Sequence, residues 1–462
     1  MPGVPTGRAC EGCRKQKKKC DEKKPACSRC LRLNIPCIGS GERRFKFKEE
    51  RRFTKSPETD NDRQIITKQE ARGFAATAAA VSAAERAART VFLPPSNELT
   101  FLTSVFVQTL KPSTDLRYNL VWNYGGFLAE VPQRLGTNEA LDASVYAVCA
   151  AHSSFCLYKD ISVEALTKYS HALRMLRVCL DDPVKASTPE TLCAVLMLLI
   201  CQAFIGTGGS SFTGHCEGAA KILKARQYTA PQNDFEAKLV LSLRGPVLFE
   251  ALWNDRIDLT PNEWESLVGS HYDSHIPEGR LLFMFSRVPC FMQRARSALN
   301  QCDISALSEE IRPIYEASQD IVDTMQSNYD EVNAIPAHSR SRFLHANHQR
   351  IYSLGLVIVT VFNCMLKALD PRNLRYKSES VDLVNKILIL CDESHDYRPL
   401  GASCNILALM TAWVANTDPI TKCVIEAALA DYQSDYPVRT LEGMSESLRI
   451  INSQLGLFAL TT

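Results

Sequence analysis

The sequence lacks any long uninterrupted apolar run. Its longest apolar stretches are Leu192–Cys201 and Leu354–Val361, both well short of the roughly 18–20 residues that a membrane-spanning helix needs. The first residues, Met1–Ala9, also contain no apolar segment of the kind found in a secretory signal peptide. We therefore expect buried core helices at the two apolar stretches, no secretion, and no membrane among the partners.

Recognisable catalytic motifs are also missing. The chain has no phosphate-binding loop of the glycine-lysine kind, no nucleophile elbow and no metalloprotease histidine pair. His345 and His348 lie three residues apart within an expected helix, but no third ligand stands out near them. These absences predict that the chain is not an enzyme.

Positive charge is concentrated at the start of the chain. The whole sequence has a net charge of only +2, yet residues 1–55 contain 17 Lys and Arg against 6 Asp and Glu, a local charge of +11. The remainder contains 36 basic and 45 acidic residues, a charge of −9. A basic head on an acidic body indicates that the head binds a polyanion such as DNA.

Cysteine is abundant and unevenly placed. Six of the 18 cysteines follow the pattern Cys10-x2-Cys13-x6-Cys20, then Cys27-x2-Cys30-x6-Cys37. The other twelve are scattered from Cys149 to Cys423 without ligand-like spacing, and we expect them to be core thiols in a reducing compartment. The second half of the clustered set repeats the spacing of the first, which indicates two similar halves around a shared centre.

Coordination arithmetic limits the metal that six such thiolates can hold. One tetrahedral zinc ion needs four ligands and would leave two sulfurs over, whereas two zinc ions need eight positions, which six sulfurs fill only if two of them bridge. The symmetric repeat favours the two-metal cluster, with a charge of −2 that the nearby lysines would partly neutralise. Because residues 10–37 form a short segment that buries little apolar surface, metal binding must supply most of its folding free energy.

Residues 10–37 resemble the fungal zinc binuclear-cluster DNA-binding domain, and their spacing matches that family completely. The resemblance implies two Zn²⁺ ions bridged by Cys10 and Cys27. It further implies that one ion is completed by Cys13 and Cys20 and the other by Cys30 and Cys37. Pro25 matches the proline that the family has in the loop between its halves.

A basic run occupies the interval between two of the cysteines: Arg14, Lys15, Gln16, Lys17, Lys18 and Lys19. One interpretation is a solvated charge run. If the flanking cysteines hold the run in a short helix, it becomes a rigid probe that fits the major groove, where lysine donates to guanine O6 and N7. The resemblance implies that Lys17 reads a CGG-like triplet with help from Gln16, where some relatives have a second lysine, while Arg14 and Lys19 hold phosphates.

The remainder of the chain divides into a linker and an all-α body. We predict a finger at residues 8–40, a linker at 41–95 and a helical regulatory domain at 96–462. The linker contains a basic stretch, Arg43–Lys48 with Arg51 and Arg52, which could follow phosphates, direct nuclear import or simply be solvated. Its alanine-rich segment at 64–89 has helical propensity but no sustained heptads.

Helical periodicity is clear in the body and no strand pattern is convincing. The expected helices are Ser162–Leu180, Leu192–Ile205, Thr213–Arg226, His348–Leu369, Ser380–Cys391 and Cys404–Ala415. In the first, the apolar stripe comprises Val163, Leu166, Tyr169, Leu173, Leu176 and Leu180. The region from Leu192 to Arg226 is similar to the fungal-specific transcription-factor domain, and there we expect His215 to be structural. The stretch 431–446 could form an activation surface or a solvated helix face.

Together these features predict a nuclear transcription factor of RNA polymerase II genes, with double-stranded DNA and the transcription machinery as partners. The weak heptad signal leaves both a homodimer and a monomer open. Family habit suggests control of a secondary-metabolism gene cluster. Two other classes compete: a thiolate-rich metal-storage or redox module, and a helical enzyme or small-ligand receptor tethered by the finger.

Overall fold

The chain divides into two units, Met1–Phe92 and Leu93–Thr462, each described here by itself. The computed structural model describes residues 9–21, 23, 26–35, 37, 97–111, 115–158, 162–206, 210–225, 231, 233–269, 276–297, 301–336, 338–436 and 448–449. Pro25, the basic stretch after the finger, the alanine-rich segment and residues 437–446 lie outside this part. Within it every regular element is a helix, which confirms the all-α prediction.

The described part of the small unit contains two single-turn helices, α1 (Glu11–Lys15) and α2 (Ser28–Arg32). Both helices pack against a centre made of cysteine sulfurs instead of aliphatic side chains. Cys10, Cys13, Cys27 and Cys30 are at most 1% exposed.

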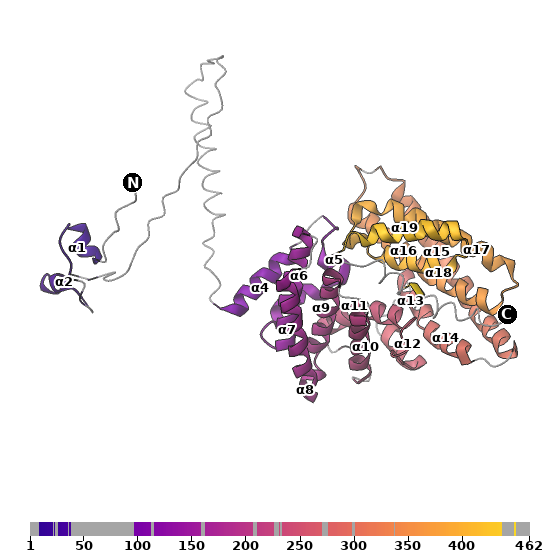
Figure 1. Ribbon diagram of the computed structural model, residues 1–462, viewed down its shortest axis with the longest axis horizontal. Coiled ribbons are helices and arrows are strands. Elements are labelled where there is room, and N and C mark those ends of the chain that lie inside the picture. The colour runs from indigo at the N-terminus through magenta and orange to yellow at the C-terminus, as the bar shows by residue number, and fades with distance from the viewer. Residues whose placement is uncertain are drawn as a thin grey trace, which may run out of the picture. The chain divides into compact units, whose positions relative to one another are not determined.

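The first part of the body is a bundle around α9 (Pro189–Ile205). This helix is apolar on all sides, with 14 of its 17 residues buried, so it must be surrounded by other helices. Its neighbours are α6, α7 and α10, which surround it in Figure 1. The elements of this part are α4 (Glu98–Thr109), α5 (Leu120–Tyr124), η1 (Gly126–Arg134), α6 (Glu139–Tyr158), α7 (Val163–Leu180), α8 (Pro183–Ala186) and α10 (Ser210–Ala225).

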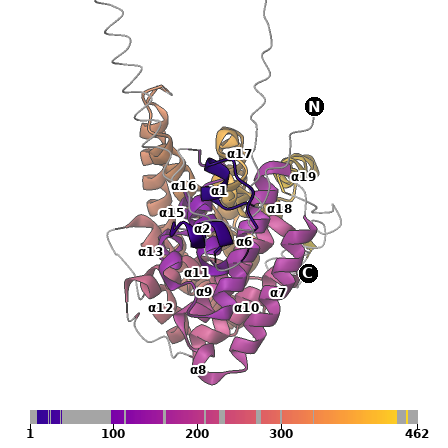
Figure 2. The same cartoon turned by 90° about the vertical axis from the view of Figure 1, so that its left-hand side faces the viewer.

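The second part of the body is built on α16 (Arg342–Leu369), which packs against α15, α17 and α18. Its helices are α15 (Gln301–Asn333), α17 (Leu374–Glu393), η2 (His395–Tyr397), η3 (Leu400–Ala402), α18 (Cys404–Ala415) and α19 (Pro419–Gln433). The two parts are joined by α11 (Asp234–Glu250), α12 (Pro261–Gly269), α13 (Pro277–Phe285) and α14 (Val288–Ser297). Figure 2 shows the long α15 and α16 lying along one another. One continuous apolar core runs through these helices except α8, which has no buried residue.

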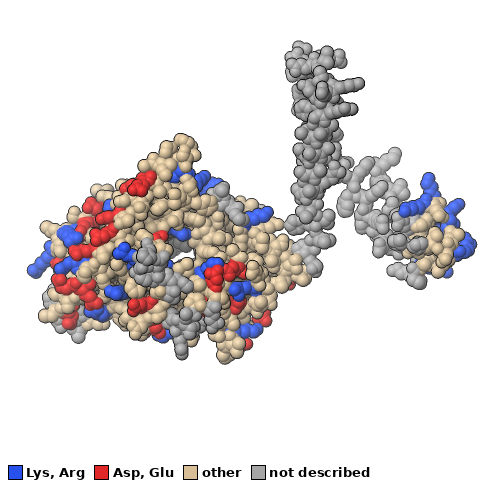
Figure 3. Space-filling model, turned by 180° about the vertical axis from the view of Figure 1, so that it is seen from behind, with Lys and Arg blue, Asp and Glu red and all other residues tan. Residues whose placement is uncertain are grey.

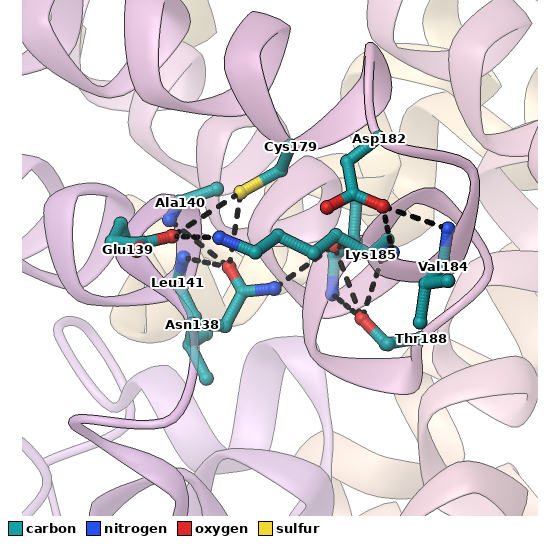
Figure 4. A network of polar contacts seen from close by, with 10 residues as sticks. Asn138, Glu139, Ala140, Leu141, Cys179, Asp182, Val184, Lys185 and Thr188 are labelled. Carbon is teal, nitrogen blue, oxygen red and sulfur yellow. Dashed lines mark hydrogen bonds and ion pairs between the residues drawn. The ribbon is translucent and has the colours of Figure 1, made fainter.

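Polar side chains fix the points at which the helices of the first bundle begin. Asn138 accepts hydrogen bonds from the backbone N–H groups of Ala140 and Leu141, and its amide donates to Thr191. Asp182 caps α8, and Thr188 caps α9. Lys185 joins the start of α8 to the start of α6 by pairing with Glu139 at 3.0 Å (Figure 4). Such caps satisfy backbone N–H groups that have no partner within the helix.

Two helices are long and apolar enough to cross a membrane by length and composition alone, one within α6 and the other α16. The uninterrupted apolar runs in the sequence are shorter than these helices, because polar residues break them. Both are mostly buried inside the helical body, with 67% and 78% of the apolar window covered. They serve as core helices of this fold.

The predicted stripe of the helix beginning after Ser162 is shifted in the structure. The buried face of α7 is formed by Ala165, Tyr169, Ala172, Leu176 and Cys179. Four members of the predicted stripe are exposed instead, namely Val163, Leu166, Leu173 and Leu180. Three of these five buried residues are small, namely Ala165, Ala172 and Cys179, and α7 packs there against α6 and α9. The positions of the neighbouring helices therefore decide which face of α7 is buried. The core-thiol prediction was likewise wrong for Cys302 and Cys423, which are exposed near helix ends.

Candidate metal centre and nucleic-acid interface

The six clustered cysteines converge on one small volume. The sulfurs of Cys10, Cys13, Cys20 and Cys27 all lie within 4.8 Å of one another. The same is true of the sulfurs of Cys10, Cys27, Cys30 and Cys37. Cys10 and Cys27, the first cysteine of each half, belong to both groups.

The sulfur spacing fits tetrahedral zinc coordination. With Zn–S bonds of about 2.3 Å, the edge of a tetrahedron of sulfurs is about 3.8 Å long. The measured S···S distances are 3.8 Å between Cys10 and Cys27, 3.7 Å between Cys13 and Cys27, and 3.6 Å between Cys10 and Cys30. All six thiols are free. The two sets of four therefore suit two ions that share two ligands.

The thiols of this centre do not ionise alike. The backbone N–H of Cys13 donates to the Cys10 sulfur, and this lowers the pKa of Cys10 to about 6. Burial, together with hydrogen bonds to neighbouring thiols, raises the pKa of Cys13 to about 12. The pKa of Cys30 is also raised, chiefly by its contact with the Cys27 sulfur. Crowded sulfurs of this kind lose all their protons only when a cation is present to hold the thiolates.

The two halves share one backbone design. Each cysteine of the second half lies 17 residues after its counterpart, as Cys27 does after Cys10. The N–H of Lys18 donates to the carbonyl of Cys13 at 2.9 Å, and the N–H of Ile35 donates to that of Cys30 at 3.1 Å. The residue before each donor is left-handed, with φ of 52° at Lys17 and 49° at Asn34. Both short helices thus end in the same tight turn.

This turn corrects the prediction that one helix carries the whole basic run. Helix α1 ends at Lys15, so Lys17, Lys18 and Lys19 lie on the returning loop. A continuous helix would carry Cys20 about 10 Å along the axis from Cys13, since each residue rises about 1.5 Å. The chain turns at Lys17 because the third sulfur must come back to the same centre.

The second helix is fixed by its own cap. The Cys27 sulfur accepts from the N–H of Cys30 at the start of α2. The carboxylate of Asp21 accepts from the N–H of Ser28 at 3.1 Å. The hydrogen bond with the Ser28 side chain, together with the weaker effect of this backbone contact, lowers the pKa of Asp21. The loop between the halves is therefore tied directly to the beginning of α2.

The basic run faces solvent. Lys15, Gln16, Lys17, Lys18 and Lys19 are all exposed. Arg14 lies in α1, and its side chain is outside the described part. Figure 3 shows Lys and Arg gathered on the small unit, whereas acidic and basic side chains intermingle on the body. Exposed lysines at the end of a short rigid helix suit contact with a polyanion.

One member of this surface was missed by sequence reasoning. Arg29 of α2 donates from Nη2 to the side-chain oxygen of Gln16 at 2.7 Å, across the two halves of the unit. Arg29 is half-buried, and its Nε has no hydrogen-bond partner among the described residues. The only signal in the sequence was an arginine placed between two ligand cysteines, Cys27 and Cys30.

In the described body, no group of three or more His, Cys, Asp or Glu ligand atoms converges as the cysteines do. His345 is buried, and its Nδ1 lies 2.8 Å from the hydroxyl of Tyr397. His215 pairs with the hydroxyl of Tyr169 at 3.0 Å. Burial lowers the pKa of each histidine to about 4. Both therefore act as neutral core groups.

The described part of the C-terminal acidic stretch, residues 431–436, contains both buried and exposed side chains. Tyr432 and Tyr436 are buried. Asp431 and Asp435 both accept hydrogen bonds from Arg398. The first part of the predicted activation surface, up to Tyr436, is therefore largely occupied by internal contacts.

Comparison with known proteins agrees with the cysteine geometry. Residues 8–46 match the fungal Zn(2)-Cys(6) binuclear cluster domain, a family whose members bind two zinc ions. An uncharacterized transcriptional regulatory protein of Schizosaccharomyces pombe is 41% identical to this chain over 49 residues, which are 11% of the chain and 6% of that protein. The chain thus spans only about 6% of the length of the curated relative it matches. No solved structure matches the chain.

Proposed function

We propose, from the premise that residues 8–46 form a fungal Zn(2)-Cys(6) binuclear cluster domain, that this chain is a sequence-specific transcription regulator. The cluster binds double-stranded DNA, and the helical body at 96–462 mediates regulation. One observation carries the proposal: two sets of four sulfurs share two members, directly beside an exposed basic run.

The metal ligands are assigned from the two sulfur sets. Cys10 and Cys27 would be ligands shared by both Zn²⁺ ions, because they are the members common to both sets. Cys13 and Cys20 would complete one site, and Cys30 and Cys37 the other. Thiolate coordination of this kind would hold both short helices in place. The role of this chain is to bring six sulfurs to tetrahedral spacing and to aim the basic run outward.

Base recognition is assigned to Lys17, which reads a CGG-like triplet in the major groove. Lys17 lies in the left-handed turn just after α1, and its side chain is exposed. Gln16 assists, and Arg14, Lys15, Lys18 and Lys19 hold phosphates around the triplet. Lysine ammonium groups donate well to guanine O6 and N7, while contacts to phosphates fix the orientation without reading sequence.

The cellular setting follows from the same domain. We place the chain in the nucleus, acting on RNA polymerase II genes through the transcription machinery, either as a monomer or as a homodimer. A secondary-metabolism gene cluster is the proposed target. The similarity to a transcriptional regulatory protein of Schizosaccharomyces pombe supports a role in transcription.

The proposal is tested with the purified full-length chain. We expect two zinc ions per chain by elemental analysis, and tighter binding to a CGG-containing duplex than to the same duplex with the triplet scrambled. A stoichiometry of one or zero would refute the cluster assignment. Equal binding to both duplexes would refute sequence-specific recognition and leave a general polyanion-binding module.

A further inference from the structure

The contact between Arg29 and Gln16 fixes which end of the Gln16 amide is free. A guanidinium group has only donors. The amide atom that faces Arg29 Nη2 at 2.7 Å must therefore be the oxygen, whichever way the amide is drawn. The NH₂ group of Gln16 is left as the outward end of this exposed side chain.

This orientation bears on base choice in the major groove. A free glutamine recognises adenine with both ends of its amide, accepting from N6 and donating to N7. Guanine presents two acceptors, O6 and N7, and needs donors only. With its oxygen already bonded to Arg29, Gln16 offers the groove mainly a donor.

We propose that Arg29 is a specificity-determining residue that acts through Gln16, holding its amide so that it favours guanine over adenine at the base pair it faces. The inference rests on the proposed DNA-binding function and adds a residue from the second half of the cluster. Arg29 is a positioning residue here. Its half-buried guanidinium is held beside α1 because α2 is tied in place by Cys27 and Asp21.

The test uses full-length zinc-loaded protein and a set of duplexes carrying CGG and each single-base replacement within and beside it. Gln16→Ala first identifies the base pair that Gln16 reads. At that pair Arg29→Met should lose roughly tenfold in guanine-over-adenine preference, the lower part of the range for a good base contact. The double variant Gln16→Ala with Arg29→Met should lose no more than Gln16→Ala alone.

A second variant guards against a folding defect. Arg29→Gln keeps a polar side chain that can donate or accept, so the Gln16 amide can face either way and the preference should relax toward adenine. Zinc content is measured for every variant. The matched control is Arg32→Met, an exposed arginine on the same helix, which should weaken all duplexes alike or leave them unchanged.

The outcomes separate the two claims. If wild-type protein shows base preference that Arg29→Met and Arg29→Gln leave intact, the inference is wrong and the proposed function stands. If Arg29→Met weakens every duplex equally and makes the salt dependence shallower by about one phosphate contact, Arg29 binds the backbone and the inference is again wrong. If wild-type protein shows no base preference, both claims fall together.

Discussion

At the scale of single residues, the most informative position is Lys17. A left-handed conformation costs an ordinary L-residue roughly 1–2 kcal/mol, and asparagine is among the few side chains that tolerate it. The second half places Asn34 at the equivalent position, while the first half places a lysine there. Backbone strain at a position where asparagine would be less strained than lysine is typical of functional positions.

Replacing Lys17 by asparagine should separate fold from recognition. Lys17→Asn keeps the left-handed turn, so both zinc ions should remain bound and thermal stability should not fall. Affinity for the CGG duplex should fall by about 1–3 kcal/mol, concentrated at the contacted base pair. Fluorescence anisotropy across single-base variants measures this, with Lys23→Asn, an exposed lysine outside the run, as control. A uniform loss on random DNA would instead make Lys17 a phosphate contact.

A second residue-scale prediction concerns a polar group inside the body. Gln202 of α9 donates to the hydroxyl of Tyr169 at 2.7 Å, and that hydroxyl also pairs with His215 of α10. Tyr169→Phe removes a hydroxyl group that links polar side chains of α7, α9 and α10. It should lower the free energy of unfolding by about 1–3 kcal/mol, because the buried side-chain nitrogens of Gln202 and His215 lose this partner.

Urea denaturation of the full chain measures this loss. The control is Tyr146→Phe, whose hydroxyl donates to the Glu98 carbonyl at an exposed site and should change stability by less than about 0.5 kcal/mol. Equal effects of the two changes would show that the Tyr169 contacts add no stability.

At the scale of elements, α19 depends on one buried cation. The side chain of Arg398 is 7% exposed, and its Nε donates to Asp435 at 2.7 Å. Its two terminal nitrogens donate to the carboxylate and the carbonyl of Asp431, and its guanidinium lies 4.3 Å from the centre of the Tyr432 ring. The planar guanidinium group of Arg398 can donate to all of these acceptors at once, whereas a lysine ammonium group could not.

Arg398→Met should loosen α19. Asp435 would lose its partner while remaining mostly covered, and we expect a loss of about 1–3 kcal/mol, less than for a fully buried pair because Asp431 is exposed. Faster amide exchange in α19 would report it. The control is Arg375→Met, a surface arginine paired with Glu316 and Glu379, with an expected loss below about 1 kcal/mol. Unchanged exchange in α19 would contradict the assignment.

Elements also show where sequence reasoning works. Periodicity located α7, α9 and α10 within three residues at each end, and α18 at both ends. Helices α16 and α17 were also found, but each begins six residues before its predicted start, His348 and Ser380. Which face of each helix is buried was harder to predict. Val163 and Leu173 are apolar and correctly spaced, yet they are exposed, because burial depends on which side the neighbouring helices occupy. Similarly, six cysteines at the right spacing predicted a shared centre, but the contact between Arg29 and Gln16 depends on the fold around that centre.

At the scale of the whole molecule, the two units have separate cores. One core is a cluster of sulfurs, and the other is a continuous apolar interior. Their charges differ as well, with +11 on residues 1–55 and −9 on the remainder. Stability and function should therefore respond to different conditions in each unit.

Chelation of zinc should unfold the small unit alone. Treating the full chain with a strong chelator is expected to abolish DNA binding and make residues 9–37 sensitive to protease, because metal supplies most of the folding free energy there. The thermal transition of the helical body should stay in place. Limited proteolysis and circular dichroism before and after chelation measure both effects, with restored zinc as control. A body that unfolds together with the small unit would contradict independent cores.

The matched backbones of the two cysteine halves also bear on how the halves divide their roles. Hydrogen bonds, left-handed turns and sulfur positions repeat at an interval of 17 residues. The two halves differ in their exposed side chains: the first presents Lys15, Lys17, Lys18 and Lys19, while the second presents Leu31, Arg32, Leu33 and Asn34. Two halves with the same backbone therefore present one basic surface. Asn34→Lys would place a second lysine at the position equivalent to Lys17.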